Sequence, residues 1–297
     1  MSMAIHTERL TKRYGGTEAL RGLDLDVPEG SIYAFVGPNG AGKTTAIQTI
    51  LNLRRPTTGR AQVLGCDSRT LPPEAFQRIG YVSENQRLPD WMTVRQFFDY
   101  LQPLYKTWDD SLHAELRRQF DLPPDRKLKQ LSRGMKMKAA LASALVFRPQ
   151  LLILDEPFTG LDPLVRDELV HGLLDRAEGM TIFVSSHDLA EIESFASHVG
   201  YLEQGRLRLS EEMTALTERF REVQVVFESG PQHPSPWPDD WLPPESSNNM
   251  LRFVDTRHDP ARWQAAFPTA RSIEAQPMNL RAIFVALARS GRKGEQS

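Results

Sequence analysis

The segment GPNGAGKT at residues 37–44 decides the fold of this 297-residue chain. It fits the pattern GxxxxGK followed by Ser or Thr. It lies between an apolar run at residues 31–36, typical of a buried parallel strand, and helical spacing at residues 44–53. Glycines let backbone amides turn toward phosphate oxygens, and the N-terminus of the following helix attracts the same anion. We therefore predict that the chain binds a nucleoside triphosphate.

Two side chains of this loop have separate tasks in the predicted site. Lys43 adds a positive charge between the phosphates, and the Thr44 hydroxyl is placed to ligate Mg²⁺. A glycine-rich turn with an incidental lysine is the alternative, which the strand–loop–helix context disfavours. The predicted phosphate-binding residues are Gly37, Pro38, Asn39, Gly40, Ala41, Gly42, Lys43, Thr44 and Thr45.

Polar residues follow two further buried strands. Asp155 and Glu156 end the run at residues 151–154, and this edge of a doubly wound sheet is where ligands bind. Asp155 is the expected partner of Mg²⁺, and Glu156, pointing to the other side, is expected to activate the attacking water. His187 follows the strand predicted at residues 181–184 and is placed to sense the γ-phosphate. A lone histidine is more often structural, but three converging strand ends favour function.

The sequence LSRGM at residues 131–135 opens a strongly helical stretch. Ser132 is a natural N-cap, so ordinary capping is the simplest interpretation. However, Arg133, Lys136 and Lys138 crowd a helix N-terminus, where the helix dipole disfavours cations. A docking anion would remove this conflict, and the pattern therefore suggests a second phosphate contact.

Composition predicts a soluble, cytoplasmic, two-part chain. Apolar residues make up 40% and charged residues 25%, the formal charge is −2, and Cys66 is the single cysteine. The near-zero charge gives no polybasic footprint, so no direct binding of nucleic acid is expected. We see no signal peptide, and the longest apolar run is too short to span a membrane.

The order of the elements predicts two domains. Residues 1–212 begin with an antiparallel hairpin and continue with alternating strands and helices, which indicates a parallel sheet covered on both faces. Residues 91–148 are mostly helical. Residues 213–297 are expected to form a small α+β domain with a proline-rich loop or linker at residues 230–247. Its last helix is expected to start at an N-cap, Asn279, and to pack through an apolar stripe of Leu280, Ile283, Phe284 and Leu287.

Residues 4–212 resemble the ATP-binding subunit of ABC transporters. Residues 37–44 look like the Walker A loop of that family, and residues 151–155 look like its Walker B strand. Glu156 is similar to the catalytic glutamate after Walker B, and residues 131–135 are similar to the LSGGQ signature.

Single residues of three more motifs also match. Asp162 lies in a segment that resembles the D-loop, His187 resembles the switch histidine, and Tyr14 falls where the family stacks an aromatic residue on adenine. The resemblance implies that two subunits close head-to-tail. ATP on one loop then meets the signature of the other subunit, here Ser132, Arg133, Gly134 and Met135.

The resemblance also implies an architecture and partners. The expected fold is a P-loop NTPase cassette with a parallel core sheet, an antiparallel β subdomain and a helical subdomain. The expected cofactors are ATP and Mg²⁺. The expected partners are a second ATP-binding subunit, in a homodimer or related heterodimer, and a separate membrane-spanning permease. ATP hydrolysis would then power transport, with export favoured, from the inner face of the cell membrane.

Two departures from the family pattern stand out. The position of the Q-loop glutamine, a ligand of Mg²⁺, is taken by Glu84, with Gln86 as the less favoured substitute. The signature has Arg133 and Met135 where the family has Gly and Gln, while Ser132 and Gly134 are kept. Both variants, and the C-terminal extension, resemble the exporter-like branch with ABC-2 type permeases.

Three alternative functions fit the sequence less well. A P-loop kinase or GTPase leaves residues 131–135 and His187 unexplained, and we find no guanine-reading segment. An ABC-type ATPase acting on ribosomes or DNA typically has two cassettes or a long coiled coil, which this chain lacks. In a non-catalytic regulatory module, the C-terminal domain would bind a partner and Glu84 and Arg133 would mark a degenerate site; an ATPase assay distinguishes this alternative.

Overall fold

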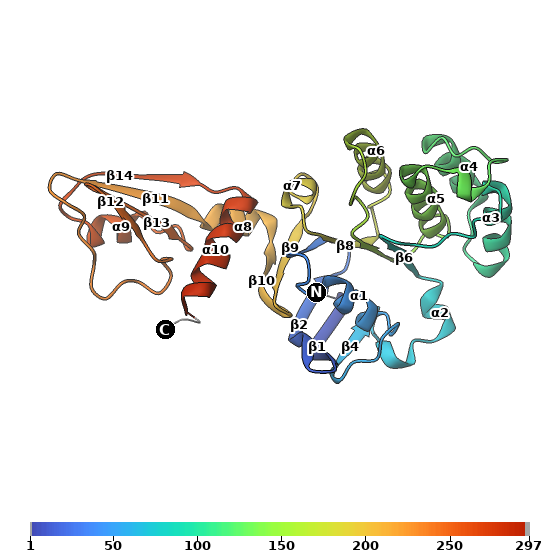
Figure 1. Cartoon of the computed structure of the whole chain (residues 1–297), viewed down its shortest axis with the longest axis horizontal. Coiled ribbons are helices and arrows are strands. Elements are labelled where there is room, and N and C mark those ends of the chain that lie inside the picture. Colours follow the sequence, from blue (N-terminus) through green and yellow to red (C-terminus); the bar gives the residue numbers. More distant parts are fainter. Residues whose placement is uncertain (1, 295–297) are drawn as a thin grey trace. The chain divides into compact units, whose positions relative to one another are not determined.

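A computed structural model describes residues 2–294, and the chain divides into two compact units with the boundary between Ser210 and Glu211 (Figure 1). The first unit is built on a six-stranded sheet with the order β10-β9-β3-β8-β7-β6. The strands β3, β6, β7, β8 and β9 are parallel. Their bounds are Ile32–Val36 (β3), Ile79–Ser83 (β6), Leu151–Asp155 (β7), Thr181–Ser186 (β8), His198–Glu203 (β9) and Arg206–Glu212 (β10).

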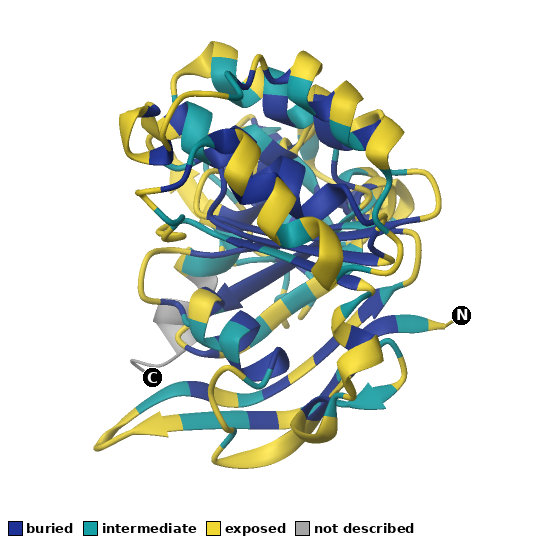
Figure 2. Ribbon diagram, turned by 90° about the vertical axis from the view of Figure 1, so that its right-hand side faces the viewer, coloured by how far each residue is buried: buried dark blue, intermediate teal, exposed yellow. Residues whose placement is uncertain are grey.

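Every residue of β7 and β8 is buried, because other elements cover both faces of the sheet (Figure 2). The continuous apolar runs at residues 151–154 and 181–184 follow from this burial. The prediction of a parallel sheet is confirmed.

A second, antiparallel sheet has the order β2-β1-β4-β5. Its strands β1 (Met3–Tyr14) and β2 (Thr17–Pro28) form the predicted hairpin, and β4 (Thr58–Val63) and β5 (Cys66–Asp67) extend it. Helix α1 (Lys43–Ile50) packs through Ala46, Ile47 and Ile50 into a core shared by both sheets. Burial of this helix fixes where its N-terminus points.

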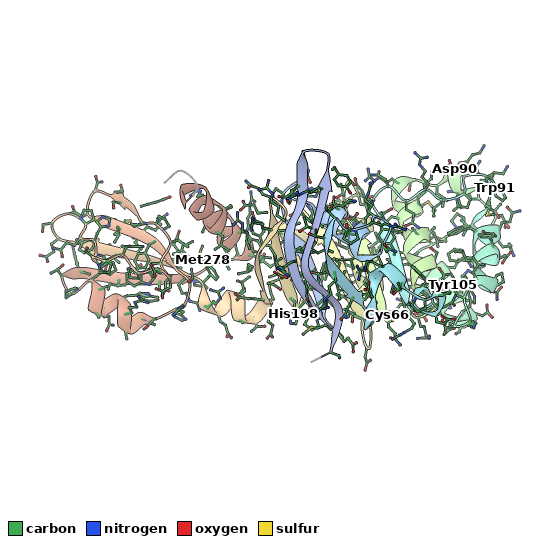
Figure 3. The ribbon with its side chains drawn as sticks, turned by 90° about the horizontal axis from the view of Figure 1, so that it is seen from below. Cys66, Asp90, Trp91, Tyr105, His198 and Met278 are labelled. Atoms are coloured by element: carbon green, nitrogen blue, oxygen red, sulfur yellow. The ribbon has the colours of Figure 1, made fainter. Side chains whose placement is uncertain are left out.

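The helical subdomain consists of α3 (Val94–Leu101), α4 (Asp110–Gln119) and α5 (Arg133–Leu145), with 3₁₀ turns at Gln102–Leu104 and Leu128–Gln130. Helix α5 packs tightly on β6, since a Cβ at Gly80 would lie 2.7 Å from the Ala144 carbonyl oxygen. Trp91, beside Asp90 at the outer end of this subdomain, is 69% exposed (Figure 3).

Short elements complete the first unit. A 3₁₀ turn (Ser68–Thr70) and α2 (Pro73–Phe76) precede β6, while α6 (Pro163–Leu174) joins β7 to β8, and α7 (Leu189–Ile192) joins β8 to β9. Within residues 2–294, every helix is too short or too polar to cross a lipid bilayer.

The second unit is a small α+β fold around an antiparallel sheet with the order β12-β13-β11-β14. Its elements are α8 (Met213–Arg219), β11 (Arg221–Phe227), β12 (Glu245–Ser247), β13 (Met250–Asp255), α9 (Pro260–Ala266), β14 (Ala270–Pro277) and α10 (Leu280–Gly294). Helix α10 starts at the expected cap, because the Ala282 amide donates to Asn279 Oδ1 over 2.8 Å. Of its predicted apolar stripe, Leu280, Ile283 and Phe284 are buried and Leu287 is half-buried.

The proline-rich stretch of this unit is a loop, but it is not a free linker. Trp241 is only 2% exposed and packs on Phe253, with 4.4 Å between the ring centroids. The Trp237 indole donates to the Trp241 carbonyl over 3.0 Å. Prolines and polar residues predicted a loop or linker here, and the buried Trp241 together with the half-buried Trp237 holds this loop against the sheet.

The hairpin carries a pH-sensitive pair. His6 of β1 lies opposite Asp26 of β2 and hydrogen-bonds to its carboxylate, while its Nε2 lies 3.1 Å from Glu8 Oε1. The hydrogen bond to Asp26, and then that to Glu8, raise the pKa of His6 above its ordinary value of 6.5. A raised pKa means that the folded state holds the proton more tightly. The resulting stabilisation is complete below the unfolded pKa and is lost as pH rises through the folded pKa.

We therefore expect His6→Gln to lower the free energy of unfolding more at about pH 5.5 than at about pH 9. Urea denaturation of both proteins at both pH values measures the two differences. Equal differences at the two pH values would show that the pair adds no pH-dependent stability.

Candidate functional site

The glycine-rich loop joins β3 to α1 and requires glycine at two positions. A Cβ at Gly37 would lie 2.2 Å from the Leu202 carbonyl oxygen, and one at Gly42 would lie 2.5 Å from the Ala19 carbonyl oxygen. Gly42 also has a φ of 109°, which disfavours other residues. Among the described residues, no side chain caps α1, so its first amides are available to an anion.

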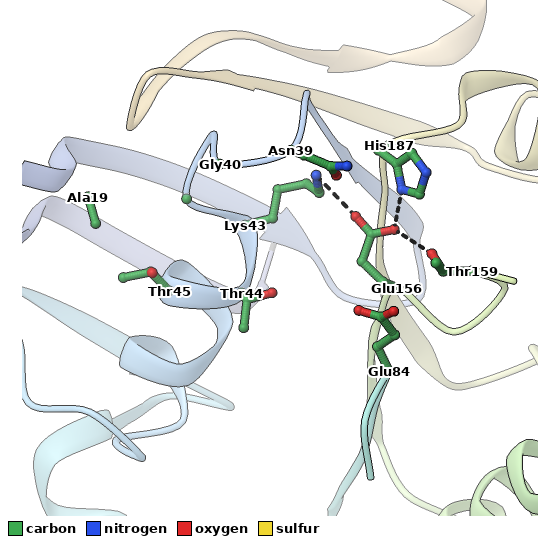
Figure 4. A pocket seen from close by; sticks show the side chains of 11 residues that line it. Ala19, Asn39, Gly40, Lys43, Thr44, Thr45, Glu84, Glu156, Thr159 and His187 are labelled. Carbon is green, nitrogen blue, oxygen red and sulfur yellow. Dashed lines mark hydrogen bonds and ion pairs between the residues drawn. The ribbon is translucent and has the colours of Figure 1, made fainter.

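This loop forms part of the wall of a pocket of about 450 Å³ (Figure 4). The pocket, called the nucleotide pocket below, joins the loop to the ends of three other strands. Its lining residues are Ala19, Asn39, Gly40, Gly42, Lys43, Thr44, Thr45, Glu84, Glu156, Thr159 and His187. Sequence-predicted residues from Walker A, the Q-loop position, the position after Walker B and the switch position thus come together here.

Asp155, the last residue of β7, contacts the lining residue Thr44. The Thr44 hydroxyl donates to Asp155 Oδ1 over 3.1 Å, and the buried Ser185 hydroxyl donates to the same oxygen over 2.7 Å. Burial raises the pKa of Asp155, against the effect of these two hydrogen bonds. The hydroxyl of Thr44 and the carboxylate of Asp155 are hard oxygen donors, which fit Mg²⁺.

Glu156 follows Asp155 but has different partners. It has a φ of 52°, in the left-handed region that most residues avoid. One carboxylate oxygen lies 3.1 Å from Lys43 Nζ, and the other lies 2.7 Å from His187 Nδ1 and accepts from the Thr159 hydroxyl over 3.0 Å. Burial favours the neutral acid, but the His187 hydrogen bond and the Lys43 charge outweigh it and hold the pKa of Glu156 below its usual value. Glu156 is therefore a carboxylate at neutral pH.

Lys43 is buried in the middle of these groups. Its ammonium group donates to the carbonyl oxygens of Gly37 over 2.6 Å and Pro38 over 3.3 Å, in addition to the ion pair with Glu156. The lysine thereby connects the loop to the end of β7, a contact that the sequence did not reveal.

Ser185 is a site residue that sequence reasoning missed. Besides donating to Asp155, its hydroxyl accepts the Glu156 amide over 3.0 Å, so one side chain orders both acids. Ser185 stands directly opposite Asp155 in the parallel register. The signal was the pair of serines, Ser185 and Ser186, that ends β8 after the apolar residues 182–184. Thr159 and Ala19 were missed as well.

The predicted signature residues lie at the start of α5. Ser132 is the N-cap and accepts the Met135 amide over 3.2 Å, as expected. Gly134 packs against α6, because a Cβ there would lie 2.9 Å from Val165 Cγ1. In the part of the chain that the structure describes, none of residues 132–135 lines the nucleotide pocket.

The argument from misplaced cations is wrong. Arg133 lies 3.3 Å from Glu84 and Lys136 lies 3.4 Å from Asp90, while Lys138 pairs with Glu168. Each cation therefore has a carboxylate partner within the same chain. These partners are distant in the sequence, so the local pattern gave the impression of unmatched charge.

Other predicted residues also lie outside the wall of the pocket. Pro38, Ala41 and Asp155 are next to lining residues in the chain and Gly37 is next to Pro38, whereas Asp162, Tyr14 and Gln86 have other surroundings. Asp162 caps α6 by accepting the Val165 amide over 3.0 Å. Tyr14 is 40% exposed at the end of β1, where the ammonium group of Lys12 lies 5.1 Å from its ring centroid. Gln86 folds back on its own turn and accepts the Ser83 amide over 3.2 Å, whereas Glu84 reaches the pocket.

Comparison with known proteins identifies this arrangement. Residues 20–159 match the ABC transporter family. The chain is 35% identical over 236 residues to the bacitracin transport ATP-binding protein BcrA of Enterococcus faecalis, covering 74% of this chain and 73% of that protein. It is 37% identical over 211 residues to the daunorubicin resistance ATP-binding protein DrrA2 of Streptomyces coeruleorubidus, covering 68% and 65%.

A solved structure of the ATP-binding subunit of an ABC transporter superposes with a TM-score of 0.66 at 26% identity, over 73% of this chain and 92% of that one. The fold and the phosphate-binding loop thus define an ATP-binding cassette. The chain belongs to the ABC transporter family, in which it is an ATP-binding and ATP-hydrolysing subunit. The predictions of family, fold class and ATPase activity are confirmed.

We expect Ser185→Ala to lower kcat for ATP hydrolysis about 10- to 100-fold, because Asp155 and Glu156 both lose an ordering contact. The lost buried hydrogen bonds should also cost about 1–3 kcal/mol of stability. Steady-state ATPase assays and urea denaturation measure the two effects. Ser143→Ala is the control. It removes a buried hydroxyl from a different element, α5, and should retain normal kcat. Equal activity in both variants would contradict the role of Ser185.

Proposed function

We propose that this chain hydrolyses ATP in the nucleotide pocket and thereby powers export through a separate, membrane-spanning permease of the ABC-2 type. The observation that carries the proposed chemistry is the contact of Glu156 with both Lys43 and His187 at the end of β7. The names of the two relatives, in bacitracin transport and daunorubicin resistance, favour export. The chain then works as a peripheral subunit on the inner face of the cell membrane.

The loop and α1 bind the phosphates of ATP in this proposal. Lys43 exchanges its contacts with Glu156 and the loop carbonyls for phosphate oxygens, while the backbone amides at the start of α1 face the same anion. Thr44, Asp155 and Glu84 are the residues that would hold Mg²⁺, and the ion would neutralise charge on the phosphates. Tyr14, exposed at the end of β1, stacks on the adenine ring.

Glu156 acts as the general base. Its ionised carboxylate can accept a proton from the attacking water, and release of Lys43 to the phosphates leaves one carboxylate oxygen for this task. His187 holds the second oxygen and faces the position of the γ-phosphate. The binding of nucleotide thus removes the ammonium group of Lys43 from the carboxylate of Glu156.

A second subunit completes the site. Residues 132–135 start a helix, lie outside their own nucleotide pocket, and include the exposed Ser132. Two subunits placed head-to-tail bring Ser132 and Gly134 of one to the ATP of the other, with Asp162 close to the junction. ATP binding favours this closed dimer and hydrolysis releases it. The permease, which binds the dimer, is thereby moved between two states.

We expect Glu156→Gln to bind ATP normally but to lower turnover about 10²- to 10⁴-fold, the usual contribution of a general base. ATP-bound dimers should accumulate, and size-exclusion chromatography with ATP detects them. Glu74→Gln, at an exposed position in α2, is the matched control and should retain full turnover. Normal turnover of Glu156→Gln would remove Glu156 from this role.

We expect Lys43→Ala to abolish ATP binding, since it removes the buried ammonium group of the pocket. Isothermal titration calorimetry of both proteins with ATP measures the loss. An affinity within about twofold of wild type would contradict the phosphate site, because a charged hydrogen bond is worth more than that.

A further inference from the structure

The two unusual positions of this cassette contact each other. Glu84 stands at the Q-loop position and Arg133 at a glycine position of the signature, 49 residues apart in the chain. Arg133 Nη2 nevertheless lies 3.3 Å from Glu84 Oε1 and donates a hydrogen bond to it. Two departures from the family pattern are therefore one interaction in space.

This pair lies at the edge of the nucleotide pocket. Glu84 follows the last residue of β6 and lines the nucleotide pocket near Glu156 (Figure 4). It also lines a neighbouring cavity of about 580 Å³, which Arg133 lines as well. Arg133 does not line the nucleotide pocket itself, so within its own subunit it reaches that pocket through Glu84.

A third loop leaves room for the guanidinium group. A Cβ at Gly160 would lie 3.1 Å from Arg133 Nη1 and 3.2 Å from its Cζ. Gly160 also has a φ of +70°, which favours glycine. The loop that leads to Asp162 therefore packs directly against Arg133 and leaves space for its flat head group.

Stability is a weak explanation for this pair. The Arg133 and Glu84 side chains are 51% and 35% exposed, and ion pairs so exposed add little to folding stability. Charge in the pocket is a stronger explanation. Glu156 already lines the pocket and Asp155 lies beside it, in contact with Thr44, while Lys43 supplies the ammonium group among the lining residues. An uncompensated Glu84 would therefore repel a triphosphate.

We propose that Arg133 is a positioning residue for the nucleotide pocket of its own subunit: it holds and neutralises Glu84. The Q-loop then carries a carboxylate without weakening the binding of ATP. This inference rests on the proposed function only in that ATP binds in this pocket. It requires the effect of Arg133 on ATP affinity to depend on the charge of Glu84.

A double-mutant cycle tests this dependence with Glu84→Gln, Arg133→Gln and the variant with both substitutions. ATP affinity is measured in EDTA by isothermal titration calorimetry, so that neither Mg²⁺ nor turnover contributes. We expect Arg133→Gln alone to weaken ATP binding about threefold to tenfold, and to change it by less than about twofold when Glu84 is already glutamine. Arg133→Lys, which keeps the charge, should retain most of the wild-type affinity.

Arg95→Gln is the matched control. Arg95 forms an exposed ion pair with Asp125 over 3.1 Å in the same helical subdomain and lies outside the nucleotide pocket. Its substitution should leave ATP affinity unchanged.

Two results would overturn the inference: an equal loss of affinity from Arg133→Gln in both backgrounds, or no loss in either. An equal loss would mean that Arg133 contacts nucleotide directly or supports the fold, and thermal unfolding of the variants separates these two causes. Wild-type protein that fails to bind ATP would instead refute the proposed function. The two failures are therefore distinguishable.

Discussion

The nucleotide pocket depends on the register of the parallel strands. Asp155 at the end of β7 pairs with Ser83 of β6 and with Ser185 of β8, and Val36 of β3 pairs with Ser186. The residues that follow these strand ends are Gly37, Glu84, Glu156 and His187, and they therefore lie within one residue of the same level, in a row along one edge of the sheet. A slip of one residue in any strand would turn its side chains to the opposite face and disperse this row.

Three acidic residues lie at this edge of the sheet, and each has its own partners. Glu156 is matched by Lys43 and His187, and Asp155 by two hydroxyl groups, while Glu84 is matched by Arg133. Only the first two acids are buried, and a buried carboxylate without partners is costly. In the proposed mechanism, an arriving triphosphate would take Lys43 from Glu156 and so would also change the electrostatic surroundings of the proposed base. Binding and catalysis are thereby connected through one ammonium group.

Local sequence patterns predicted the fold well because the pattern and its cause are both local. Continuous apolar runs mark strands that are buried on both faces, and the cap at Asn279 depends on residues within one helical turn. Long-range contacts were predicted poorly. The partners of Arg133, Lys136 and Lys138 lie on other elements, and so does the aromatic core that holds Trp241. A one-dimensional pattern cannot show that two distant charges meet.

The site was predicted in the same uneven way. Motif residues around Lys43 and Glu156 come together because strand ends define their position. Ser185 could not be predicted in this way, because its role follows from the strand register, which places it opposite Asp155. The roles given to Tyr14, Asp162 and residues 132–135 stay predictions, since they depend on ATP or on a second subunit.

The pair of Glu84 and Arg133 shows what such motif comparison overlooks. Taken singly, each residue is a departure that weakens the resemblance, because one adds a negative charge near phosphates and the other adds bulk to a glycine position. In space, the positive charge meets the negative one, and Gly160 leaves room for the added bulk. Three loops that are far apart in the sequence meet at one guanidinium group. A substitution in any one of these loops is therefore constrained by the other two. Glu84 and Arg133 are better interpreted as one altered contact than as a loss of function.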